Sequence, residues 1–231
     1  MINTNLNQTS VDLELTRPAV SLTDFALAIE CIVFTVLLSR LPASDAVLRR
    51  WFVVFFASVA AASLLGGTMH GFFEYSTSPF RTVLWTATLL AILVTSFATW
   101  SIAAILQLDE SAAQWVRRFA LAQILLLTLV ILFVSKQFVV AIVAYLPATV
   151  FLLVAFWRAY VYTREPALKA GIAGLVLTFI GAAVQQLKLA AHPVYFDHNA
   201  LYHVIQFVAL WMIYRAARWI STAQPIVRRT S

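Results

Sequence analysis

The sequence has 231 residues, of which 62% are apolar and only 11% are charged. A soluble domain has about a quarter charged residues, so this chain has too little polar surface to face water, and a soluble globular protein is excluded. Disorder is excluded for the opposite reason, because apolar residues are abundant. The lipid bilayer is therefore the expected solvent for this chain.

Seven apolar runs are each long enough to cross a bilayer, which takes about 20 residues of helix. Charged or turn-forming residues separate them, and the shortest separation is Lys136 and Gln137, between the fourth and fifth runs. We expect an all-α, polytopic seven-transmembrane helix bundle with spans near residues 23–41, 51–73, 82–107, 119–135, 137–160, 168–190 and 200–220. The domain layout is then an extracytoplasmic tail over residues 1–22, the helical domain over 23–220 and a cytoplasmic tail over 221–231.

The distribution of basic residues predicts the orientation of the bundle. With seven spans, twelve of the 16 Lys and Arg residues fall on the side that holds the C-terminus. Cytoplasmic loops are enriched in Lys and Arg, so we expect a cell-membrane protein with its N-terminus outside and its C-terminus in the cytoplasm. The net charge of +6 is then explained by this orientation and by contact with anionic membrane lipids, which are the expected partners. No nucleic-acid partner is expected.

Polar residues inside the spans are few, and an ionisable one costs about 2.5–3.5 kcal/mol at mid-membrane. With a helical rise of 1.5 Å per residue, each is predicted to lie within roughly 10 Å of the outer membrane boundary, so all of them share one depth. They come from the first, second, sixth and seventh spans: Glu30, His70, Glu74, Gln185, Gln186, Lys188, His198, His203 and Gln206. We expect them to meet at the outer end of the bundle, where small-residue stripes on the second and sixth spans allow close packing.

Three of these residues are histidines, which indicate a metal site. Three imidazoles with water in the fourth position are the ligands of an open catalytic zinc site, which lowers the pKa of the bound water to about 7. His70, His198 and His203 are the candidate metal ligands, with zinc as the expected cofactor. Glu30 or Glu74 is a candidate general base, or a residue that orients a ligand. Taken singly, such histidines are more often hydrogen-bonded bundle residues.

Seven spans, one His late in the second and a His pair opening the seventh resemble the alkaline ceramidase and adiponectin-receptor (PAQR, CREST) superfamily of membrane hydrolases. The resemblance implies zinc held by one His of the second helix and two of the last. The predicted N-outside orientation is similar to that of the ceramidases, and Glu30 is similar to an acidic residue of their first helix. The stretch from His198 to His203 (H-N-A-L-Y-H) also resembles uncharacterised bacterial membrane proteins.

The sequence departs from that superfamily at several positions. A Ser is expected four residues before the second-span His, but Gly66 stands there, and Ser63 one turn earlier is the candidate catalytic substitute. An Asp expected near the third span is absent. His198 and His203 are five residues apart, about 140° around a helix, so they converge only if His198 precedes the helix proper.

Three functions fit this pattern. The first is a zinc-binding membrane protein, and in its more specific form this protein hydrolyses a lipid-like amide or ester that enters from the outer leaflet. The second is a small-solute transporter, although no inverted repeat is visible. The third is a non-enzymatic sensor or scaffold that uses the histidines as a proton switch. A retinal protein is disfavoured because the seventh span contains no Lys.

Overall fold

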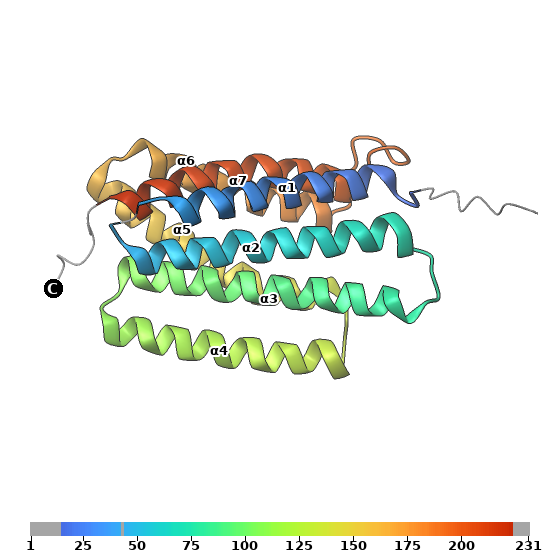
Figure 1. The fold of residues 1–231 in the computed structure, drawn as a ribbon, viewed down its shortest axis with the longest axis horizontal. Helices are drawn as coiled ribbons and strands as arrows, with labels where there is room; N and C mark the ends of the chain where they lie inside the picture. Colours follow the sequence, from blue (N-terminus) through green and yellow to red (C-terminus); the bar gives the residue numbers. More distant parts are fainter. Residues whose placement is uncertain (1–14, 43, 224–231) are drawn as a thin grey trace, which may run out of the picture.

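The computed structural model describes residues 15–42 and 44–223, which form a bundle of long helices (Figure 1). Its elements are α1 (Pro18–Arg40), α2 (Ala46–Thr68), a π-helical turn η1 (Met69–Phe73) that continues α2, α3 (Pro79–Gln107), α4 (Glu110–Phe133), α5 (Phe138–Thr163), α6 (Pro166–Gln186) and α7 (His198–Thr222). Seven helices, with α2 and η1 counted as one, are long and apolar enough to cross a membrane. The all-α seven-helix bundle predicted from the sequence is confirmed.

Local sequence signals define where the helices begin. Proline occupies the first turn of α1, α3 and α6, where its missing N–H is not needed. The carboxylates of Asp45, Asp109 and Asp197 accept hydrogen bonds from the first free backbone N–H groups of α2, α4 and α7. The turn between α4 and α5 lies at residues 134–137, as the interruption at Lys136 predicted.

Four predicted span boundaries differ from the helix ends by four or more residues. α2 begins at Ala46, not near residue 51, α4 begins at Glu110, not near residue 119, and the other two are the start of α1 and the end of α6. The first helix begins at Pro18, not near residue 23, so the last residues of the predicted tail are helical, and Val20 and Ser21 are buried against the bundle. The sixth helix ends at Gln186 because Lys188 turns the backbone into the left-handed region, with a φ of 54°. Residues 1–14 and 224–231 of the predicted tails lie outside the described part of the chain.

Small residues bring two pairs of helices into close contact. A Cβ on Gly174 of α6 would lie 2.6 Å from the Ala209 carbonyl oxygen of α7, and one on Gly67 of α2 would lie 2.9 Å from Asp24 Cβ of α1. Neither position leaves room for a side chain. The small-residue stripes predicted on the second and sixth spans are therefore packing surfaces, with α2 held against α1 and α6 held against α7.

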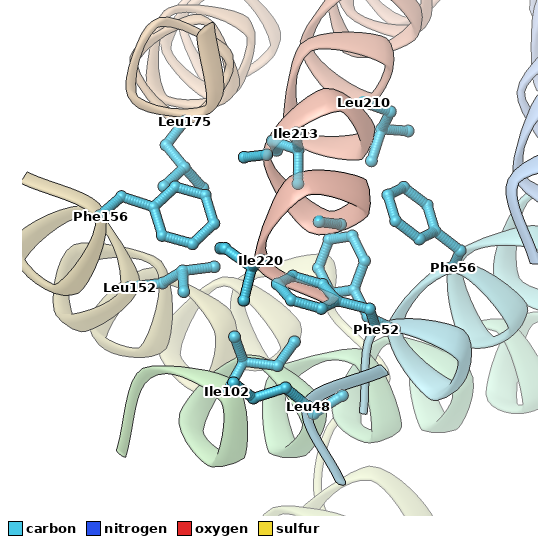
Figure 2. Close-up of a cluster of buried hydrophobic side chains, with 14 of the residues drawn as sticks. Leu48, Phe52, Phe56, Ile102, Leu152, Phe156, Leu175, Leu210, Ile213 and Ile220 are labelled. Atoms are coloured by element: carbon cyan, nitrogen blue, oxygen red, sulfur yellow. The ribbon is translucent and has the colours of Figure 1, made fainter. Parts of the chain in front are cut away.

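A large apolar core fills the half of the bundle in which α1 ends. Figure 2 shows side chains of α2, α3, α5, α6 and α7 pointing toward one another there, among them Phe52, Phe56, Ile102, Phe156 and Ile213. Phe34 of α1 stacks on Tyr214 of α7, with ring centroids 4.2 Å apart. α4 lies at the edge of the bundle beside α3 (Figure 1), and most of its apolar side chains face outward.

Substituting Gly174 by Ala tests the close contact of α6 and α7. The added Cβ meets a backbone oxygen that cannot rotate away, so we expect a loss of about 1–3 kcal/mol of stability even though Ala favours helices. Thermal unfolding of the purified protein in detergent measures the effect. Ala183→Val adds bulk on the exposed side of the same helix and should leave the Tm unchanged. A Gly174→Ala protein as stable as the wild type would contradict the assigned packing.

Candidate functional site

A cavity of about 400 Å³ lies in the half of the bundle where α1 begins. Its walls come from the first halves of α1, α3, α5 and α7 and from the last part of α2 and α6, with η1. Apolar side chains form much of the wall, including Leu27, Val59, Ile92, Leu146 and Phe179. The polar groups on the wall are Asp24, Ser63, His70, Thr88, Thr95, Tyr145, Thr149, Thr178, Gln185, His198, Asn199, Tyr202, His203 and Gln206.

The course of α5 leaves room for this cavity. Before Pro147, α5 packs on α3 and α4 through Val140, Ala141 and Ala144. After Pro147, it joins the core shared with α6 and α7 through residues such as Phe156. Pro147 has no N–H to donate to the carbonyl four residues earlier, that of Val143. At the next residue, the Ala144 carbonyl accepts a hydrogen bond from the Ser96 hydroxyl of α3 at 2.8 Å. The first half of α5 thus belongs to a different apolar cluster from α6, with the cavity between them.

Asp24 and His203 form a buried acid–base pair on the cavity wall. Asp24 Oδ1 lies 3.3 Å from His203 Nε2, and Thr23 Oγ1 lies 3.1 Å from His203 Nδ1. The Thr23 hydroxyl donates its proton to the backbone carbonyls of Ala19 and Val20, so it accepts from Nδ1–H. His203 Nε2 and Asp24 Oδ1 therefore face each other 3.3 Å apart, so an acid and a base lie side by side on the cavity wall.

His70 belongs to a second polar network, at the end of the cavity. The π-helical turn η1 carries it, and its Nδ1 contacts Glu74 Oε2 at 2.8 Å. Arg17, just before α1, lies 3.3 Å from Glu74 Oε1 and also pairs with Asp197, which precedes α7. These contacts join the ends of three helices beside His70.

Electrostatics keep both carboxylates of this network ionised. The hydrogen bond from His70, helped by the charge of Arg17, holds the pKa of Glu74 below its ordinary value despite burial. Burial alone would raise the pKa of Asp197, but hydrogen bonds from the Ala200 backbone N–H and from Arg17 outweigh it, and the pKa is lowered. Because Glu74 is ionised it can only accept, so His70 Nδ1 is the donor.

Most of the predicted site residues lie together. His70, His198, His203 and Ser63 all line the same cavity, and Glu74 contacts His70 directly. Glu30 does not line the cavity. It is buried elsewhere, and its Oε2 has no hydrogen-bond partner within the described residues. The physical reason is rotation, since a residue six positions after Asp24 points about 120° away around the helix.

The sequence analysis missed Asp24 and Arg17. Both fell at or before the presumed start of the first span, where charges are ordinary. Pro18 followed by a long apolar run is a helix-start signal, and it would have placed Asp24 one and a half turns inside the helix. Asp24 is then the acidic residue that lines the cavity.

The three histidines do not form a metal centre in this arrangement. Across residues 15–42 and 44–223, no three His, Cys, Asp or Glu side chains are grouped so that they could hold one ion. His203 has both ring nitrogens engaged, and His70 has Nδ1 engaged. A shared metal requires at least the contact between Asp24 and His203 to give way.

Fold and site together define a membrane-protein-like seven-helix bundle with a cavity of mixed apolar and polar lining in one half. The chain belongs to the family described as a family of unknown function (DUF6962), whose profile matches residues 19–222. That match covers all seven helices almost completely. No curated protein and no solved structure matches the chain.

Arg17→Gln tests the network of ion pairs. Glu74 and Asp197 have lowered pKa values, so their stabilising effect is present above an unfolded pKa of about 4 and is lost as the pH falls through the folded values. We expect the variant to lose about 1–2 kcal/mol at pH 7 and to approach the wild type below about pH 4. Unfolding measured across this pH range tests both parts.

Lys188→Gln is the matched control for that experiment, because it removes one positive charge at the same end of the bundle outside the network. It should change stability little at either pH. An Arg17→Gln deficit of equal size at pH 7 and at about pH 2, where both carboxylates are protonated, would contradict the assigned role of the ion pairs.

Proposed function

We propose that this protein binds a small amphiphilic, lipid-like molecule in the cavity between its helices. The observation that carries the proposal is the cavity itself, whose wall combines many apolar side chains with polar groups such as Asp24, His70 and His203. Its volume of about 400 Å³ lies within the range of small-molecule sites, which have the same mixture of surfaces.

The division of the walls indicates how such a molecule would lie. Leu27, Val59 and Leu146 offer contact to an alkyl chain, while Asp24 and His203 offer a donor and an acceptor to a hydroxyl, amine or carbonyl group. A buried polar pair is costly when it lacks partners. A ligand with a matching polar group therefore gains specificity there as well as apolar contact.

Passage of a solute through the bundle is less well supported. Beyond the cavity the aromatic rings of Phe34, Phe56 and Tyr214 pack together, with the Phe34 and Phe56 centroids 5.3 Å apart. Phe52 and Ile220 lie in the same apolar core. Because the cavity ends at this packed core, a solute has no passage between the described helices. Binding of a ligand within one half of the bundle is therefore favoured over transport of a small solute.

Hydrolysis of the bound molecule is the second candidate. The Asp24–His203 pair favours it, because a proton donor and acceptor on the wall of a ligand cavity can serve general acid–base chemistry. Ser63 lines the same cavity as a candidate hydroxyl group. Zinc binding by His70, His198 and His203, the superfamily resemblance and the N-outside orientation stay predictions from the sequence.

Photolabelling tests binding of an amphiphile. We expect a diazirine derivative of dodecanamide to label the purified protein on peptides that line the cavity. Ala182 lines the cavity and Ala183 is exposed, so Ala182→Trp should reduce labelling about tenfold, equivalent to about 1.4 kcal/mol of binding. Ala183→Trp adds the same side chain one residue away and should label like the wild type. Equal labelling of both variants, or labelling confined to the outer surface, would overturn the proposal.

Metal analysis tests the zinc prediction. If zinc is bound, protein purified without chelators should contain about one equivalent, and His70→Ala or His203→Ala should lose it while keeping the fold. His192→Ala is the control, because His192 is exposed in the loop before α7 and hydrogen-bonds to Val194, Tyr195 and Phe196 of the same loop. Zinc-free wild-type protein would exclude the zinc hydrolase without affecting the proposed binding.

A further inference from the structure

A second pocket adjoins the cavity at the end of the bundle where α1 begins. Its volume is about 490 Å³, and it lies between η1, the start of α3 and the turn between α4 and α5. His70, Trp85 and Phe138 line both spaces. These three side chains lie between the two spaces, so the second pocket and the cavity are direct neighbours.

Two cations, Arg81 and Lys136, line this second pocket. Backbone contacts hold both positions: Arg81 Nε donates to the Glu74 carbonyl oxygen at 2.9 Å, and Trp85 Nε1 donates to the Lys136 carbonyl oxygen at 2.7 Å. These contacts use none of the terminal nitrogens of either side chain. Within the described residues, neither Arg81 nor Lys136 forms an ion pair with a carboxylate.

The nearest acidic group does not neutralise these cations. Glu74 also lines the second pocket, but its carboxylate is bound to Arg17 and to His70. Arg17, by contrast, is itself fully engaged by Glu74 and Asp197. Both side chains are exposed, so the positive charge in the second pocket is available to a ligand.

We propose that Arg81 and Lys136 form a binding site for a phosphate group. A guanidinium fork binds phosphate oxygens in pairs, and a Lys ammonium adds a mobile point charge. The adjoining cavity holds the apolar part of the same molecule, and this second half of the inference rests on the proposed function. The ligand class is then a phosphate-bearing amphiphile, with the phosphate at the edge of the bundle.

The test compares three probes in a nonionic detergent at low salt: dioctanoyl phosphatidic acid, dioctanoylglycerol and inorganic phosphate. The two lipids differ only in the phosphate group. We expect the wild type to bind the phosphatidic acid about fivefold to tenfold more tightly than dioctanoylglycerol, and this ratio to fall as salt is added. Titration calorimetry gives each affinity directly.

Arg81→Gln combined with Lys136→Gln should bring that ratio close to one and leave the affinity for dioctanoylglycerol unchanged. The unchanged affinity also shows that the variant is folded. Lys188→Gln removes a charge at the same end that lines neither pocket, so it should keep the wild-type ratio.

The outcomes distinguish a phospholipid ligand from free phosphate, or else reject the phosphate site. Binding of inorganic phosphate that depends on Arg81 and Lys136, without binding of either lipid, supports the phosphate site with a soluble ligand and overturns the proposed amphiphile binding. Equal affinity for both lipids, unaffected by the double substitution, overturns the phosphate site and leaves amphiphile binding standing. Binding of no probe overturns both.

Discussion

Close contact between paired helices is the constraint on which the rest of this structure depends. Gly67 lets α1 lie against α2, and Gly174 lets α6 lie against α7. In a bilayer no hydrophobic effect drives helices together, so such small-residue surfaces provide the van der Waals contact. The contact between α1 and α2 places Asp24 beside Gly66, and that between α1 and α7 completes the pair of Asp24 with His203.

The cavity follows from what these tight pairs leave unfilled. α5 is shared between two apolar clusters, one with α3 and α4 and the other with α6 and α7, and Pro147 lies where it passes from one to the other. The region between α5 and α7 is packed at one end and hollow at the other. Apolar side chains form much of its lining, which makes the space suited to the alkyl part of an amphiphile.

Polar groups in the half of the bundle that holds the cavity form two networks with different roles. Arg17, Glu74 and Asp197 join the beginnings and ends of helices, and their contacts stabilise the bundle. Asp24 and His203 lie against each other on the wall of the cavity. His70 belongs to both, since it lines the cavity and binds Glu74. A ligand that contacts His70 is thereby coupled to the ion pairs that close the end of the bundle.

The sequence alone determined the number of helices, their membrane-spanning length and hydropathy, and most of their boundaries, because hydropathy and capping act over a few neighbouring residues. It also indicated that His70, His198, His203 and Ser63 lie near one another, because topology places them at one depth. Only the tertiary structure decided which polar groups meet. Glu30 and Asp24 lie less than two turns apart on α1, yet their rotation around the helix leaves one outside the cavity and pairs the other with His203. Depth follows from position in the chain, whereas contact depends on how each helix is rotated against its neighbours.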